Sequence, residues 1–187
     1  MPDTISETGR AALAELQGVL DGIDEAEFNG LIEELAVARR VVLHGVGREG
    51  LMMRALAMRL FHLGLDAHVL GDMTTPPVEA GDLLVVSAGP GWFSSIAALA
   101  GRARGAGARV ACITAEPEGD VPRAADRILV LPAQTMARDQ AGTTSVLPMG
   151  SLYEGAQYMA FEILVLRLRD RIGETAETMR ARHTNLE

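Results

Sequence analysis

Two glycine-rich stretches contain the residue types in this sequence that are best suited to hold a ligand. Residues 44–50 read HGVGREG and residues 87–95 read SAGPGWFSS, and each follows a short apolar run and precedes a helical pattern. Backbone N–H groups at the start of a helix have no partner inside it, so such loops attract anions. One loop alone indicates no more than a tight turn. Two of them predict a ligand site, provided that the fold brings them together.

The first stretch also has the G-x-G-x-x-G spacing of a dinucleotide-binding turn. In that kind of site an acidic residue follows the next strand and binds the ribose. Here residues 66–72 read DAHVLGD, and Asp72 lies beyond the expected strand. A dinucleotide site is therefore the minority interpretation.

The elements around these loops alternate between strands and helices. We expect strands at 41–45, 66–70, 83–87, 109–114 and 127–131, and helices at 51–64, 95–107 and 121–126. Such alternation predicts an α/β fold, a parallel sheet with helices on both faces. With the common strand order 2-1-3-4-5, ligands bind beyond the carboxyl ends of strands 1 and 3. Both glycine-rich loops fall at that place.

Helical segments flank this core. Residues 5–20 and 24–38 have helical patterns, with Asp24 as an N-cap, and form a packing or oligomer arm. A long helix is expected from about Pro148 to Arg169, with the proline in its first turn. It is too apolar for one exposed face, so it must pack in the core or between subunits. We therefore expect one domain: a helical arm (1–39), an α/β core (40–132), and a polar loop, long helix and tail (133–187).

Composition excludes several classes of protein. A formal net charge of −8 argues against nonspecific binding to nucleic acid or to an anionic membrane. The start of the chain lacks a signal-peptide pattern, and no apolar run is long enough to span a bilayer. The single Cys112 has no disulfide partner, suits a buried strand, and belongs to no zinc-type cluster. We expect a cytoplasmic protein without a structural metal.

Five segments resemble, in order, the 6-phospho-3-hexuloisomerase group of the sugar isomerase (SIS) domain family. They are GVGREG, AMRLFHLG, VVSAGPG, LPMGSLYE and ARHTNLE, and they extend over nearly the whole chain. The resemblance implies a flavodoxin-like five-stranded parallel sheet, in homodimers or homotetramers. It also implies an enzyme that moves a carbonyl between adjacent carbons of a phosphorylated sugar without a metal or organic cofactor, converting 3-hexulose 6-phosphate to fructose 6-phosphate.

The resemblance also implies catalytic residues, because this reaction needs a base, an acid and a donor for the enediolate oxygen. Glu154 lies where the family carries its candidate base. His183 lies in the tail and is a candidate acid or base in a neighbouring subunit's site; a solvated tail histidine is the equal alternative. Arg48 offers a positive charge to the phosphate or the enediolate. Arg59 and His62 lie three apart on one helix face, where they act together or form a polar contact strip.

The candidate binding residues lie in the two loops, apart from Arg59 on the helix that follows the first loop. They are Gly45, Gly47, Arg48, Arg59, Ser87, Gly89, Gly91, Ser94 and Ser95. The family's phosphate loop typically reads SGSGET, whereas this chain reads SAGPGW, with Pro90 lacking an N–H donor. The family's GRSG is GREG here, which places Glu49 where a hydroxyl is usual.

These departures predict weaker phosphate binding. A carboxylate at Glu49 repels a phosphate, and the indole of Trp92 crowds it. Ser94 and Ser95 would compensate by capping the helix and offering hydroxyls. The polar segment before the long helix adds three residues whose hydroxyls suit contacts with a sugar: Thr143, Thr144 and Ser145.

Three functions remain open from the sequence. The main hypothesis is a sugar-phosphate isomerase of the 6-phospho-3-hexuloisomerase type, with the family's substrate or an altered one. The alternative is a noncatalytic SIS domain that binds a sugar or another small metabolite. A third is an isomerase or lyase for an unphosphorylated or carboxylated sugar, with Trp92 stacked on its ring. The chain shows no helix-turn-helix segment of the kind that transcription regulators use.

Overall fold

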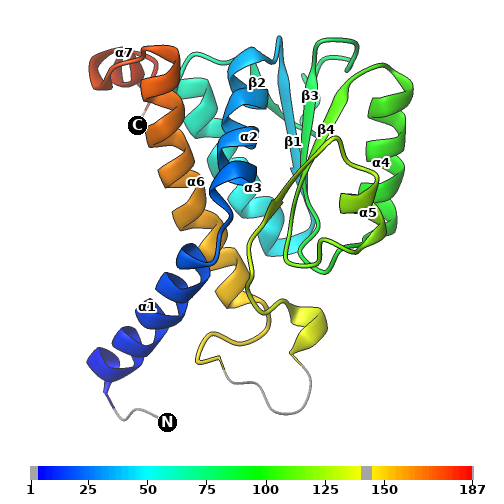
Figure 1. Cartoon of the computed structure of the whole chain (residues 1–187). Coiled ribbons are helices and arrows are strands. Elements are labelled where there is room, and N and C mark those ends of the chain that lie inside the picture. Colours follow the sequence, from blue (N-terminus) through cyan, green and yellow to red (C-terminus); the bar gives the residue numbers. More distant parts are fainter. Residues whose placement is uncertain (1–3, 140–144, 187) are drawn as a thin grey trace.

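A five-stranded parallel sheet forms the centre of the molecule (Figure 1). The computed structural model describes residues 4–139 and 145–186. The strands are β1 (Val41–Gly45), β2 (Ala67–Val69), β3 (Leu83–Ser87), β4 (Arg109–Thr114) and β5 (Arg127–Val130). Their order is β2-β1-β3-β4-β5, and every neighbouring pair is parallel. The predicted strand order is confirmed, and only β2 is clearly shorter than predicted.

Helices cover both faces of the sheet, as predicted (Figure 1). They are α1 (Ile5–Asp21), α2 (Glu25–Val37), α3 (Gly47–His62), α4 (Ser94–Gly105), α5 (Asp120–Arg123), α6 (Ser151–Ile172) and α7 (Ala176–Ala181), with a 3-10 turn at Met136–Arg138. One core lies between the sheet and α2, α3 and α6, and a second lies beneath α4 and α5. Within the described residues, no helix has the length and apolar character needed to cross a membrane.

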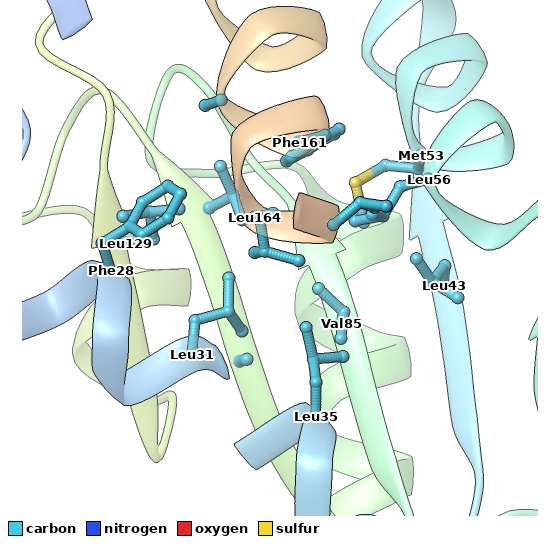
Figure 2. Close-up of a cluster of buried hydrophobic side chains, with 14 of the residues drawn as sticks. Phe28, Leu31, Leu35, Leu43, Met53, Leu56, Val85, Leu129, Phe161 and Leu164 are labelled. Carbon is cyan, nitrogen blue, oxygen red and sulfur yellow. The ribbon is translucent and has the colours of Figure 1, made fainter. Parts of the chain in front are cut away.

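The larger core explains the long apolar helix of the sequence. Figure 2 shows Phe161 and Leu164 of α6 among side chains from α2, α3 and the strands. The apolar stripe of α2 (Phe28, Leu31, Ile32 and Leu35) is fully buried here. Asp24 caps α2 by accepting hydrogen bonds from two backbone N–H groups, as predicted. Helix α2 is thus a core element, whereas α1 lies mostly exposed beside α6 (Figure 1).

Three helix starts differ from the predictions. Helix α3 begins at Gly47 rather than at residue 51, so the glycine-rich GREG is the helix's first turn. Helix α6 begins at Ser151, because Met149 and Gly150 have left-handed φ angles of 55° and 82° that turn the chain after Pro148. The N-cap of α4 is Phe93, which makes no side-chain capping bond, so the capping role expected of Ser94 and Ser95 is wrong.

Helices α3 and α6 lie against each other and run in the same direction (Figure 1). At their starts, Arg48 of α3 donates a hydrogen bond to Ser151 of α6 at 2.9 Å. Further along, Arg59 pairs with Glu162 at 3.2 Å. An α-helix rises 1.5 Å per residue, so Arg48 and His62 lie roughly 20 Å apart along α3. The first turns of both helices therefore share one end of the molecule, and their last turns share the other.

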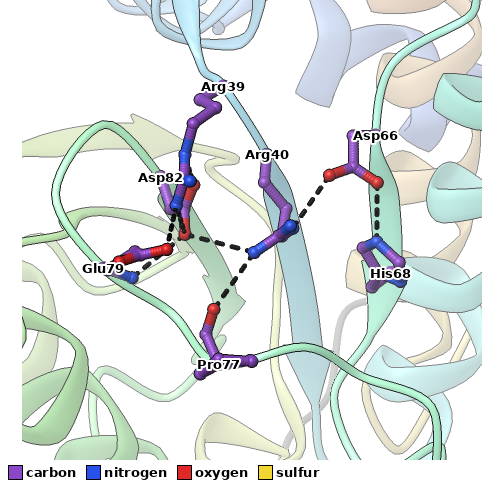
Figure 3. A network of polar contacts seen from close by, with 7 residues as sticks. All are labelled: Arg39, Arg40, Asp66, His68, Pro77, Glu79 and Asp82. Carbon is purple, nitrogen blue, oxygen red and sulfur yellow. Dashed lines mark hydrogen bonds and ion pairs between the residues drawn. The ribbon is translucent and has the colours of Figure 1, made fainter.

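A polar network ties together the opposite, amino-terminal edge of the sheet (Figure 3). The side chain of Asp82 is fully buried, and Arg39 donates to it at 2.9 Å. Arg40 donates to Asp66 at 2.8 Å and to the carbonyl of Pro77 at 3.1 Å (Figure 3). His68 contacts Asp66 at 2.7 Å, which gives this histidine a structural partner. The charged groups at this edge hold strands and loops together.

Candidate active site

A cavity of about 710 Å³ opens beyond the carboxyl ends of β1 and β3. Its walls come from the first turn of α3, the β3–α4 loop, the segment around the 3-10 turn, and the start of α6. The lining residues are Val46, Gly47, Arg48, Glu49, Pro90, Trp92, Phe93, Thr135, Met136, Ala137, Pro148, Met149, Gly150, Ser151, Tyr153 and Glu154. The two glycine-rich loops thus meet where the strand order predicted a ligand site.

Glu154 lies in the first turn of α6 and faces this cavity. Its side chain is 16% exposed, and its Oε2 lies 2.8 Å from Nη2 of Arg48. Arg48 also donates to the carbonyl of Met149 and to Ser151, which fixes the guanidinium across the start of α6. Burial raises the pKa of Glu154, Arg48 opposes that rise, and the nearby Glu49 adds to it. A carboxylate with a raised pKa, next to a cation, is suited to accept and return a proton.

Glu49 lies in the first turn of α3 and is buried against the β3–α4 loop. Its Oε2 accepts hydrogen bonds from the Ser87 hydroxyl at 2.5 Å and from the Gly89 N–H at 3.0 Å. Burial raises its pKa, and the two hydrogen bonds lower it in part. Gln157 donates to Ser87 at 2.8 Å, and the Tyr153 hydroxyl lies 3.4 Å from the same oxygen. Ser87 is therefore the centre of a buried polar cluster behind the cavity wall.

The rest of the wall is largely apolar. Pro90, Trp92 and Phe93 form one side, and the indole of Trp92 is half exposed. Thr135 is buried, and its hydroxyl has no hydrogen-bond partner among the described residues. An unpaired buried hydroxyl is costly unless a ligand or water satisfies it. Thr135 is thus a candidate contact for a sugar hydroxyl that the sequence reasoning missed, because it follows no recognisable pattern.

The other predicted loop residues have mostly structural surroundings. A Cβ at Gly45 would lie 3.0 Å from the Gly50 nitrogen, and one at Gly91 would lie 3.0 Å from the Gly119 Cα. Gly47 lines the cavity with a φ of 58°, a conformation that suits glycine. Ser94 and Ser95 are exposed and are absent from the described cavity lining.

The polar segment before α6 is described only in part. Thr143 and Thr144 lie outside the described residues. Ser145 donates a hydrogen bond to Glu15 of α1 at 2.5 Å, so its hydroxyl ties the segment to α1.

Arg59, His62 and His183 gather at the other end of α3. They line a smaller cavity of about 280 Å³, together with residues of α6 and α7. The rings of His62 and His183 stack with their centroids 5.2 Å apart. Arg182 donates to the carbonyl of His62 and pairs with Glu174, which holds the tail against α3. The structure therefore brings the two histidines and Arg59 together, but places them away from Glu154 within one chain.

Metal ligands form no cluster in the described part of the chain: nowhere do three or more His, Cys, Asp or Glu side chains meet in an arrangement suited to a metal ion. The thiol of Cys112 is buried in β4, and burial raises its pKa to about 12, as suits an unreactive core residue. The polar side chains that line the large cavity include Glu49, Ser151 and Thr135 and the carboxylate–guanidinium pair of Glu154 and Arg48.

Comparison with known proteins identifies the family. The sequence profile of the SIS domain matches residues 34–162. The chain belongs to the SIS domain family. This SIS domain includes both glycine-rich loops, the whole sheet and the first half of α6.

Relatives of this SIS domain indicate which group within the family it resembles. A 3-hexulose-6-phosphate isomerase of Bacillus subtilis is 33% identical over 94% of this chain and 95% of its own. One of Mycobacterium gastri is 38% identical over 88% of this chain and 82% of its own. A Methanococcus jannaschii protein, whose crystal structure infers the function of a 3-hexulose-6-phosphate isomerase, has a TM-score of 0.83 and 26% identity, with 97% of this chain and 99% of that chain covered. The predicted family, group and fold are confirmed.

Proposed function

We propose that this chain is a sugar-phosphate isomerase of the 3-hexulose-6-phosphate isomerase type, with that substrate or an altered one, and that it moves the carbonyl of a ketose to an adjacent carbon through an enediolate. This is the reaction type that the name of its 3-hexulose-6-phosphate isomerase relatives implies. The observation that carries the proposal is the partly buried Glu154 beside Arg48 at the edge of a cavity of about 710 Å³. The arrangement supplies a base and a fixed positive charge in one place.

In this proposal Glu154 moves the proton. Its carboxylate takes a proton from the carbon next to the carbonyl, and the electron pair of that C–H bond forms the enediolate. The guanidinium of Arg48 stabilises the negative oxygen, because it is a fixed charge at the cavity's edge. The proton then returns to the former carbonyl carbon, and the hydroxyl proton passes from the second enediol oxygen to the first. These two transfers complete the carbonyl shift with no net change in oxidation.

We further propose that His62 and His183 act in the site of a second copy. Along α3, His62 lies roughly 20 Å from Arg48, the partner of Glu154, which is too far for both ends to touch one sugar. The two histidines line a cavity of about 280 Å³, in which His183 is exposed and His62 is 7% exposed, so a neighbouring copy would contact His183 first. A homodimer or homotetramer that pairs the two ends would place a histidine, a side chain able to accept or donate a proton, beside the ketose.

Deuterium exchange tests the proposed function. The protein is incubated with fructose 6-phosphate and with fructose in deuterium oxide, and incorporation of deuterium at the carbon next to the carbonyl is followed by NMR. Glu154→Gln is expected to lower the exchange rate by about 10²–10⁴-fold, the usual contribution of a general base. Asp170→Asn, an exposed carboxylate on the same helix, is the matched control and should exchange at the wild-type rate.

The outcomes separate the two hypotheses for this site. Wild-type exchange in Glu154→Gln removes that residue from the mechanism. Ligand-induced thermal stabilisation with no exchange by the wild-type protein favours a noncatalytic SIS domain that binds a small metabolite.

A further inference from the structure

The β3–α4 loop already binds a carboxylate of the protein itself, that of Glu49. The carboxylate of Glu49 accepts from both the Ser87 hydroxyl and the Gly89 N–H. It packs directly over the loop backbone, since a Cβ added at Gly89 would lie 2.8 Å from Glu49 Oε1. A hydroxyl and a backbone N–H that converge on one oxygen are the contacts such a loop offers to an anionic ligand.

The neighbouring backbone donors of the loop are also used. The Ala88 N–H donates to the Ile113 carbonyl at 2.9 Å, and the Gly91 N–H donates to the Ala88 carbonyl at 2.8 Å. Pro90, between them, has no N–H. From residue 88 to residue 91, every backbone N–H is therefore bonded within the chain. A phosphate would have to use the start of α4 instead, whose N-cap Phe93 makes no side-chain capping bond.

The surroundings of the loop also disfavour a phosphate. Arg48 is the single basic residue among the described residues that line the cavity, and it is already paired with Glu154. A phosphate at the loop would lie near the two carboxylates of Glu49 and Glu154, and like charges at short range repel in a site of low dielectric. The last two side chains of the loop, those of Trp92 and Phe93, offer apolar surface to a ligand.

We propose that Glu49 is a specificity-determining residue that occupies the anion-binding donors of the β3–α4 loop, so that this loop receives the uncharged, hydroxyl-bearing end of a ketose and not a phosphate. The word ketose rests on the proposed function, whereas the exclusion of phosphate from the loop rests on the contacts of Glu49 alone. The other carboxylate oxygen of Glu49, Oε1, accepts a hydrogen bond from a sugar hydroxyl. The Trp92 ring packs on the C–H face of the sugar. Pockets commonly combine an apolar wall with a few placed polar groups in this way.

Two substitutions separate the carboxylate's charge from its position in the loop. Glu49→Ser frees the Ser87 hydroxyl and the Gly89 N–H. Glu49→Gln keeps an acceptor of the same size and removes only the charge, so it preserves the packing if the serine variant is poorly folded. Glu118→Ser, an exposed glutamate paired with Arg123, is the matched control.

The measurement is a thermal-shift titration of each protein with inorganic phosphate, fructose and fructose 6-phosphate, since a ligand that binds the native state raises the melting temperature. The wild-type protein is expected to bind fructose and fructose 6-phosphate with similar affinity. Glu49→Ser should gain about tenfold or more in affinity for fructose 6-phosphate over fructose, and Glu49→Gln should gain less. The control should behave as the wild-type protein.

Two results would overturn the proposal. One is an equal response of wild-type, Glu49→Ser and Glu49→Gln proteins to phosphate and to fructose 6-phosphate. The other is a strong wild-type preference for fructose 6-phosphate that the Glu49 variants lose. Neither depends on turnover, so absence of deuterium exchange would count against the proposed function and leave this test intact.

Discussion

The two ends of the α3–α6 helix pair differ in both chemistry and enclosure. At the first turns, Arg48 and Glu154 face a cavity of about 710 Å³ with an apolar wall. At the last turns, Arg59, His62 and His183 line a more basic surface cavity of about 280 Å³. The first end has the carboxylate that the proposed mechanism uses as a base, and the second end has two imidazoles. Because the helices are parallel, a single copy keeps the two sets of groups apart, and under the proposed mechanism a site with both sets requires two copies.

The largest expected effect comes from the end that lies far from the cavity. The double variant His62→Asn and His183→Asn should lose about 10²–10⁴-fold in deuterium exchange if these imidazoles transfer protons in another copy's site. The measurement is the exchange assay described above, together with the solution mass of the protein.

Mixing variants decides whether the two ends meet. The histidine double variant and Glu154→Gln are unfolded, mixed and refolded together, and the mixture should regain activity because hybrid oligomers contain one site with both intact sets. Each variant refolded alone is the control. A monomeric solution mass, or wild-type exchange by the double variant, would show that the ends work independently.

A smaller effect is expected at Arg48. Arg48→Gln removes the charge that faces the enediolate and should lower exchange by about 10–100-fold, in the range of a lost charge-assisted contact. It should also raise the pKa of Glu154 further, because Arg48 opposes the effect of burial. Arg54→Gln, one exposed arginine along the same helix, should leave the rate unchanged. Equal loss in both variants would point to a general effect of helix charge.

The pH dependence of deuterium exchange tests the role of Glu154 at the large cavity. Its pKa is raised above the ordinary 4.5, so exchange should fall as the pH drops through a midpoint above 4.5, by about tenfold per unit below it. The sign for stability is opposite: ionised Glu154 disfavours the folded state above the raised pKa, and this penalty is absent below 4.5. Glu154→Gln should therefore melt no lower than wild type at neutral pH. An acid midpoint at or below 4.5 would contradict the assignment.

The smallest effect concerns the tail at the histidine end. Arg182 lowers the pKa of Glu174 to about 2, from an ordinary 4.5. A lowered pKa contributes stability above 4.5 that is lost as the pH falls from 4.5 to about 2. Hydrogen exchange of α7 amides should rise in that window in wild type. In Glu174→Gln it should be raised already at neutral pH, and a wild-type pattern there would show that other contacts hold the tail.

Much of the fold could be predicted from the sequence because its signals are local. Short apolar runs separated by helical patterns predicted the parallel sheet and its order, and Asp24 predicted a helix start. The start of α6 could not be predicted in this way. Pro148 suits a first turn, but the left-handed Met149 and Gly150 delay the helix, and that conformation depends on tertiary contacts.

The candidate site was predicted in place and less well in detail. The strand order located both glycine-rich loops correctly. Glu49 was recognised as a charge beside the phosphate loop, but its hydrogen bond to Ser87 joins residues 38 apart and depends on how two loops pack. The separation of His62 from Glu154 also needs the direction of α6 relative to α3, which neither helix's pattern contains. No sequence signal marked Thr135.

The parallel course of α3 and α6 has an electrostatic consequence. Peptide dipoles of helices that run in the same direction reinforce each other, with the positive ends together and the negative ends together. Glu49 and Glu154 both lie in first turns, where the positive ends offset part of the cost of burying two carboxylates near each other. The same field favours negative charge that develops on a bound sugar. At the last turns, the negative ends favour the positive charges of the arginines there, Arg59 of α3 and Arg169 and Arg171 of α6.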